Sequence, residues 1–136
     1  MKLTARYHFA ASHRLHTPAL SDEENRSLYG KCNNPYGHGH DYAIDLTMDG
    51  PVGEDGQVVN RMEMDALVRE KVLARLDHKN INMDVDEFAR LVPTTENLAE
   101  VIRGWLEAGW TLAPRLVRVQ ISETDRNTFA WEAAGS

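Results

Sequence analysis

Apolar and polar residues alternate along two early stretches of the chain, a pattern typical of strands with one buried face. In residues 2–11 the apolar face consists of Leu3, Ala5, Tyr7 and Phe9. In residues 38–49 the apolar face consists of Tyr42, Ile44, Leu46 and Met48. We therefore predict a strand over each stretch, with these rows turned toward the core. The polar segment between them, which includes the acidic residues 21–25, is predicted to be a loop.

Two later stretches show helical periodicity instead. The first is predicted over residues 61–75, where Asn60 and Glu63 have the spacing of a capping box. The second is predicted to begin at residues 93–96 and to end near Gly109. Its apolar stripe consists of Leu98, Val101, Ile102, Trp105 and Leu106. Residues 76–82, between the two helices, predict a loop.

Two final strands are predicted near residues 115–122 and 127–132. Val117, Val119 and Ile121 share one face of the first strand, and Glu123 follows on the same face. A carboxylate at that position either pairs with another group or faces a cleft. The order of elements predicts an α+β domain with helices packed on one side of an antiparallel sheet. Open sheet edges favour pairing between subunits, so we expect an oligomer.

The composition limits the classes of function. The 136 residues are 42% hydrophobic, which suits one compact domain over residues 1–136. The formal charge is −6 without a block of lysine or arginine, which argues against nucleic acid or a membrane surface as the main partner. The sequence has no run of about 18 apolar residues and no apolar signal core, and its single cysteine suits a reducing compartment. We therefore expect a cytoplasmic protein.

Ligand chemistry is concentrated in residues 28–42, which contain Cys32, His38 and His40. Residues two apart on a strand point to the same face, and their Cα atoms are roughly 6.6 Å apart. Two imidazoles at that separation can reach one zinc ion. The same parity places both histidines in the apolar row of Tyr42, so they are predicted to point inward.

A catalytic zinc ion usually has three protein ligands and one open position, so a third ligand is required. The candidates are His8, His13, His16, His78 and Cys32. His13 is favoured among them, because an antiparallel pairing of the first two strands brings it alongside His38 and His40. The spacing alone leaves the other candidates open.

Six motifs follow one another along the chain: FAASHRL at 9–15, LSDEEN at 20–25, YGKCNNP at 29–35 with GHGH at 37–40, LDHKN at 76–80, TTEN at 94–97 and ETD at 123–125. In this order the chain resembles the 6-pyruvoyltetrahydropterin synthase family of the tunnelling fold. The resemblance implies a four-stranded antiparallel sheet with two helices on one face. It also implies trimers joined edge to edge and stacked into a hexameric barrel, with active sites between subunits.

The resemblance also implies roles for individual residues. It implies one Zn²⁺ per subunit, held by His13, His38 and His40. It implies that Cys32 is a general base, with Asp77 and His78 as a proton relay beside it.

The remaining implied roles concern the pterin. Glu123 resembles a residue that anchors the pterin ring, assisted by the segment Thr94, Thr95 and Glu96. A carboxylate suits that task, because it can accept two roughly parallel hydrogen bonds from a flat edge of two donors.

The implied reaction converts 7,8-dihydroneopterin triphosphate to 6-pyruvoyltetrahydropterin with loss of triphosphate. A carbon-bound proton in the side chain of this substrate is weakly acidic, so the reaction needs a Lewis acid on the neighbouring oxygens as well as a base. Cysteine acts as a base only as its thiolate, and its ordinary pKa is about 8.5. The zinc charge, Lys31 and a protonated His78 are each expected to lower the pKa of Cys32. A triphosphate leaving group can also recruit Mg²⁺, for which the sequence shows no dedicated site.

Two alternatives remain open. The first is 6-carboxytetrahydropterin synthase of the queuosine pathway, which releases acetaldehyde and triphosphate from the same substrate. That group usually has the spacing C-x3-H-x-H, whereas five residues separate Cys32 from His38 here, which favours the pyruvoyl reaction. The second is a non-catalytic zinc- or pterin-binding module, which predicts metal binding without turnover.

Overall fold

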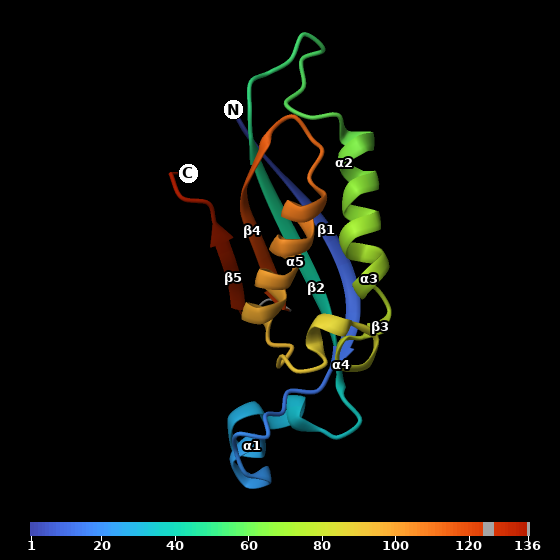
Figure 1. The fold of residues 1–136 in the computed structure, drawn as a ribbon, viewed down its shortest axis with the longest axis vertical. Helices are drawn as coiled ribbons and strands as arrows, with labels where there is room; N and C mark the ends of the chain where they lie inside the picture. Colours follow the sequence, from blue (N-terminus) through green and yellow to red (C-terminus); the bar gives the residue numbers. More distant parts are fainter. Residues whose placement is uncertain (124–126, 136) are drawn as a thin grey trace.

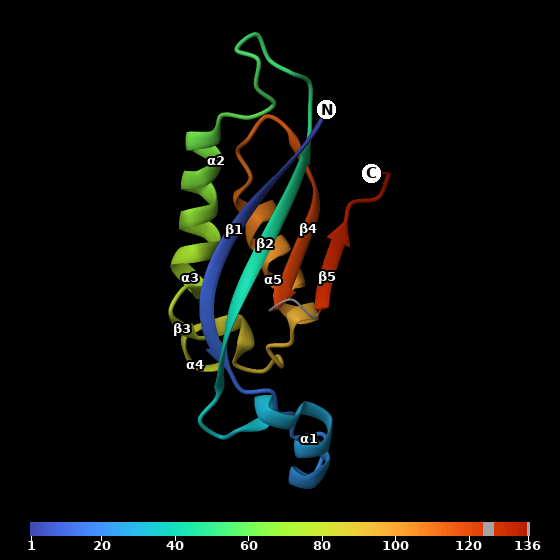
Figure 2. The same ribbon diagram turned by 180° about the vertical axis from the view of Figure 1, so that it is seen from behind.

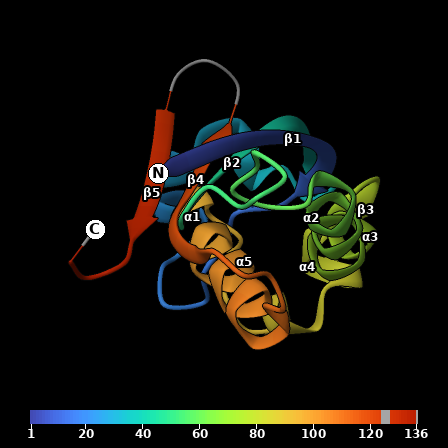
Figure 3. The ribbon, with the colours of Figure 1, turned by 90° about the horizontal axis from the view of Figure 1, so that it is seen from above.

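The computed structural model describes residues 1–123 and 127–135. In it, helices cover one face of a β-sheet (Figures 1 and 3). The strands are β1 (Lys2–His13), β2 (His38–Asp49), β3 (Lys79–Asn80), β4 (Arg115–Glu123) and β5 (Asn127–Glu132). The helical segments are α1 (Asp22–Tyr29), η1 (Gly30–Asn33), α2 (Arg61–Val68), η2 (Arg69–Leu73), α3 (Ala74–Leu76), α4 (Ile81–Asp84), η3 (Asp86–Phe88) and α5 (Thr95–Gly109).

The strand order across the sheet is β3-β1-β2-β4-β5. β1 and β2 pair antiparallel over their whole length, with Lys2 opposite Asp49 and His13 opposite His38. β4 pairs antiparallel with both β2 and β5. The four predicted antiparallel strands are therefore confirmed, and their register brings His13 and His38 to the same end of the sheet.

The sheet nevertheless has five strands, so the prediction of four was incomplete. β3 is only two residues long and runs parallel to β1, with Lys79 opposite Ala11 and Asn80 opposite Ser12. It lies in the segment 76–82 that was predicted to be a loop. A strand this short has no periodicity of its own, because it forms only where the end of β1 offers its edge.

The predicted loop around residues 21–25 is also wrong, since α1 begins there. The Ser21 side chain accepts a hydrogen bond from the Glu24 backbone N–H, and the Glu24 carboxylate accepts one from the Ser21 backbone N–H. This is a complete capping box. At the predicted helix near residue 61, by contrast, the Asn60 side chain accepts from the Glu63 N–H alone. The helical region there runs on to Leu76 through the π-helical turn η2.

The core lies between the sheet and the helices. Ile44, Leu46 and Met48 of β2 and Leu98, Ile102 and Leu106 of α5 are each 0% exposed, which confirms the predicted faces of both elements. Figure 2 shows the opposite face of the sheet, which carries no helix along β1, β2 and β4. In the part of the chain that the structure describes, no helix combines the length and apolar character needed to span a bilayer.

Candidate metal centre and active site

Four side chains with metal-binding atoms meet at the end of the sheet where β1 ends and β2 begins. They are His13, Cys32, His40 and Glu123, and their ligand atoms all lie within 4.8 Å of one another. The two histidines come from the paired strands β1 and β2, Cys32 from the turn η1, and Glu123 from the end of β4. We call this set the His–Cys–Glu cluster.

His13 is completely buried, and its ring is held in one orientation. Nδ1 lies 3.0 Å from the backbone carbonyl oxygen of Pro93 and 3.2 Å from the Tyr42 hydroxyl. A carbonyl only accepts hydrogen bonds, so Nδ1 carries the proton and donates it to Pro93. Nε2 then carries the lone pair, and this buried atom has no hydrogen-bond partner among the described residues.

His40 is oriented by a carboxylate in the same way. Its Nδ1 lies 3.1 Å from Glu123 Oε1, and its Nε2 lies 3.6 Å from Cys32 Sγ. The other carboxylate oxygen of Glu123 accepts a hydrogen bond of 2.7 Å from the Thr95 hydroxyl at the start of α5. A carboxylate on one ring nitrogen makes the other nitrogen a better ligand.

Burial favours the neutral forms of these groups. It lowers the pKa of His13 to about 4, and the neighbouring His40 acts in the same direction. Burial also lowers the pKa of His40, against the opposing effect of the Glu123 carboxylate. For Cys32, burial raises the pKa of the thiol, and the negative charge of Glu123 raises it further. The expectation that Lys31 and His78 lower this pKa is therefore not met in the chain by itself.

The cluster has the ligand atoms and the unpartnered nitrogen that a bound metal ion would require. A neutral, buried imidazole nitrogen without a partner leaves a polar atom unsatisfied, which is costly in a protein interior. A cation at that nitrogen would satisfy it, and the other ligand atoms of the cluster lie near enough to accommodate one, since all four are within 4.8 Å of one another. Imidazole, thiolate and carboxylate are the ligand types that zinc prefers.

The predicted ligand His38 lies beside the cluster rather than in it. Its side chain is exposed, and its ring centroid lies 4.6 Å from that of His40. His13 and His40 are equally close, at 4.7 Å between ring centroids. The three predicted histidine ligands are thus neighbours, but Cys32 and Glu123, not His38, complete the closest set of ligand atoms.

The segment at the start of α5 contributes unequally to the site. Thr95 is buried and contacts Glu123, as described above. Thr94 is the N-cap, and its hydroxyl accepts a hydrogen bond from the Asn97 backbone N–H. Glu96 is exposed. Of the three residues, therefore, Thr95 alone is joined to the cluster by a contact in the described part of the chain.

The predicted relay residues Asp77 and His78 pair with each other, and His78 lines a pocket that His40 of the cluster also lines. His78 Nδ1 lies 3.1 Å from Asp77 Oδ2, and the other Asp77 oxygen accepts the backbone N–H of Ala10. The His78 side chain is 82% exposed, and its backbone has a φ of 60°. Within residues 1–123 and 127–135, no hydrogen bond joins either residue to Cys32.

The groups that orient His13 were not predicted from the sequence. The Pro93 carbonyl and the Tyr42 hydroxyl both contact its Nδ1, and Tyr42 is 1% exposed. Tyr42 shares the parity of His38 and His40, so a signal for it was present. The carbonyl of Pro93 had none, because any residue could supply it. Residues 124 and 125 of the ETD motif lie outside the described residues.

Comparisons with known proteins agree with this geometry. The family model described as 6-pyruvoyl tetrahydropterin synthase matches residues 2–134. A 6-pyruvoyl tetrahydrobiopterin synthase from Poecilia reticulata is 45% identical over 125 residues, covering 90% of this chain and 84% of the relative. A putative 6-carboxy-5,6,7,8-tetrahydropterin synthase from Archaeoglobus fulgidus is 31% identical over 61 residues, covering 45% of this chain and 48% of the relative.

A solved structure matches the whole architecture. The 6-pyruvoyl tetrahydropterin synthase of Caenorhabditis elegans superposes with a TM-score of 0.90 at 34% identity, covering 98% of this chain and 96% of that one. A TM-score this high over nearly the full length means that the strands and helices correspond in order and position. The chain therefore belongs to the 6-pyruvoyl tetrahydropterin synthase family.

Proposed function

We propose that this protein is a zinc-dependent lyase that converts 7,8-dihydroneopterin triphosphate to 6-pyruvoyltetrahydropterin and triphosphate. One observation carries the proposal: a lone thiol, two oriented imidazoles and a carboxylate converge in a chain that matches this family over residues 2–134. The chemistry needs a base next to a cation and a separate group that fixes the pterin. The cluster supplies residues of each type.

His13 and His40 would hold the metal through their Nε2 atoms, with the neighbouring His38 as a third ligand after rotation of its exposed side chain. The contacts of their Nδ1 atoms with Pro93 and Glu123 fix both rings before metal binds, so little ordering is required then. When bound, zinc supplies Lewis-acid polarisation of the substrate's hydroxyl oxygens and a positive charge beside the thiol.

Cys32 would accept the proton from a carbon atom in the side chain of the substrate. Its raised pKa keeps it a neutral thiol in the protein alone, so it becomes a base only when a positive charge adjoins it. Because ionisation of the thiol requires a neighbouring positive charge, the thiol is reactive only when the site holds its metal ion. Glu123, held by Thr95, presents a carboxylate for the donor edge of the pterin.

Asp77 and His78 fit this scheme best as a contribution to a neighbouring subunit. The resemblance implies active sites between subunits, and the exposed His78 lies next to β3 at an edge of the sheet, which supports this proposal. An imidazole there is open to a partner subunit, whereas no contact brings it to Cys32 of its own subunit among the described residues. We therefore propose an oligomer, a hexamer by resemblance, in which each site combines residues of two subunits.

The pyruvoyl reaction is favoured over the carboxy alternative by two observations. The spacing of Cys32 and His38 is that of the pyruvoyl enzymes, and the match to the putative carboxy relative covers less than half of the chain.

The deciding experiment is incubation of the zinc-loaded protein with 7,8-dihydroneopterin triphosphate, with the products analysed by anaerobic mass spectrometry. We expect a pyruvoyl product and free triphosphate. A carboxy product with acetaldehyde would assign the queuosine reaction instead. Zinc binding without any turnover would overturn the proposed enzyme and leave a binding module.

A further inference from the structure

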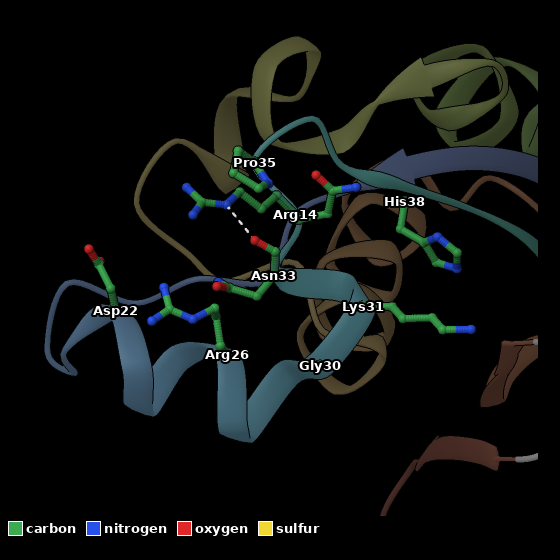
Figure 4. A pocket seen from close by; sticks show the side chains of 9 residues that line it. Arg14, Asp22, Arg26, Gly30, Lys31, Asn33, Pro35 and His38 are labelled. Atoms are coloured by element: carbon green, nitrogen blue, oxygen red, sulfur yellow. Dashed lines mark hydrogen bonds between the residues drawn. The ribbon is translucent and has the colours of Figure 1, made fainter.

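A second feature of the site is a pocket of about 470 Å³ whose wall includes Arg14, Arg26 and Lys31. Figure 4 shows the guanidinium groups of Arg14 and Arg26 on the side of Asp22, whereas the Lys31 side chain extends the other way, on the side of His38. The three cationic side chains come from the end of β1, from α1 and from η1. We call this pocket the cationic pocket. Nothing in the proposed chemistry of the cluster uses these three cations.

The cationic pocket is lined by three cationic side chains and by one carboxylate, Asp22. Among the described residues, no carboxylate forms an ion pair with Arg14, Arg26 or Lys31. Asp22 is four residues from Arg26 on α1, yet these two side chains also remain apart. The protein has a formal charge of −6, so three cations gathered around one carboxylate run against its overall balance. Such a group is a local site for an anion.

The backbone connects the cationic pocket directly to the His–Cys–Glu cluster. Arg14 follows the buried His13, and Lys31 precedes Cys32, so each cation is the sequence neighbour of a cluster residue. The Arg14 guanidinium is held by a hydrogen bond of 3.1 Å from Nε to the Asn33 carbonyl, which leaves both Nη groups for a ligand.

His38 forms the border between the cationic pocket and the cluster. It lines the pocket, and its ring lies 4.6 Å from that of His40, between ring centroids. A ligand held at the cluster could therefore extend past His38 into the pocket without leaving the surface of one subunit.

We propose that the cationic pocket binds a polyphosphate, namely the triphosphate tail of the substrate, while the pterin and its side chain lie at the cluster. This inference rests on the proposed function for the identity of the substrate. Guanidinium groups match phosphate oxygens with paired hydrogen bonds, and the Lys31 ammonium adds a mobile point charge. The pocket then orients the tail away from the base and retains triphosphate after it is released, so free triphosphate competes with substrate.

The test measures binding of inorganic triphosphate by calorimetry, first to chelator-treated protein and then to zinc-loaded protein. Arg26→Gln and Lys31→Gln remove one charge each from exposed side chains, so both variants should fold normally. Arg14 is left in place because it also holds the Asn33 carbonyl. The matched control is Arg115→Gln, which removes the same charge from an exposed position opposite Asp49, at the far end of β2 from His38.

We expect triphosphate to bind the parent without zinc and to bind more tightly than inorganic phosphate does. Each pocket variant should weaken triphosphate binding roughly tenfold, because one charge-assisted contact is lost. The control should match the parent. Added salt should weaken binding to the parent more than to the variants, because fewer charge pairs remain to be screened.

Two results would overturn the inference. The first is equal affinity of the parent and both pocket variants. The second is binding that requires zinc and does not respond to the variants, since the metal alone would then capture the phosphate. These results are independent of turnover. A protein that binds triphosphate in the cationic pocket but fails to convert 7,8-dihydroneopterin triphosphate would refute the proposed reaction and keep the polyphosphate site.

Discussion

Two clusters of polar side chains on the same sheet differ in whether their charges and hydrogen bonds are satisfied within the protein. On the open face, Arg6 donates two hydrogen bonds to the Asp45 carboxylate, of 2.8 and 2.9 Å, and Thr4 pairs with Thr47 at 2.8 Å between hydroxyl oxygens. The hydrogen bond from Arg6 keeps the pKa of Asp45 below its ordinary value. Here charge and hydrogen-bonding capacity are satisfied within the protein.

The His–Cys–Glu cluster lies under the other face and is incomplete by itself. His13 leaves a buried nitrogen without a described partner, and burial holds the thiol of Cys32 neutral by raising its pKa. This contrast distinguishes structural from functional polar groups within one fold. A cluster of polar side chains whose charges and hydrogen bonds are matched within the protein stabilises the fold. A cluster with a buried ligand atom that has no partner in the protein marks a binding site.

The largest expected effect is on turnover at Cys32. Cys32→Ser keeps a similar volume but replaces the thiol with a hydroxyl that ionises far less readily. We expect turnover to fall at least about 100-fold, as for the loss of a general base, with zinc content unchanged. Triphosphate release and metal analysis measure the two quantities. A rate near that of the parent would remove Cys32 from the mechanism.

Cys32→Ser also tests whether the relay residue His78 acts on Cys32 of its own subunit or of a neighbouring subunit. His78→Ala should also lose turnover, and co-expression of His78→Ala with Cys32→Ser should restore part of it if each site takes the two residues from different subunits. Mixed oligomers that remain as inactive as the single variants would argue for a relay within one subunit, or for none.

The next effect concerns metal binding and sharpens the comparison between buried and exposed histidines. His13→Asn removes the unpartnered Nε2, so we expect zinc affinity to fall by more than about tenfold. His8→Asn is the matched control, because His8 is on the same strand but exposed on the open face. Zinc titration against a competing chelator compares the two variants. Equal losses in both would show that the variants act through general destabilisation of β1.

The smallest effect is expected on the open face. The pKa of Asp45 is lowered in the folded state, so its contribution to stability is complete above the ordinary value of 3.8 and is lost as the pH falls through the folded-state pKa. Asp45→Asn should therefore be slightly less stable than the parent near neutral pH, and this difference should shrink below about pH 3.8. Thermal melts of chelated protein across that range test the sign, and turnover of the variant should match the parent.

Local sequence patterns predicted most of the strands and the face of the sheet on which Glu123 lies. The alternation of residues 38–49 gave β2 with its observed bounds, and the parity of Glu123 placed its carboxylate beneath the sheet end. α1 was not predicted, although Ser21 and Glu24 have the spacing of its capping box, because a run of acidic residues is also typical of an exposed loop. β3 had no such signal, since two residues carry no period.

The antiparallel strands, the two main helical regions and the residue types of the site follow from the sequence alone, because alternation and spacing are local properties of a polypeptide. Which ligand atoms meet depends on the tertiary structure. It brings Cys32 and Glu123 to His13 and His40, supplies the Pro93 carbonyl that fixes a tautomer, and leaves His38 at the border. Asp77 and His78 pair with each other, without a hydrogen bond to Cys32 among the described residues. These outcomes depend on strand register and on packing between elements that are far apart in the sequence. No local sequence pattern encodes such contacts.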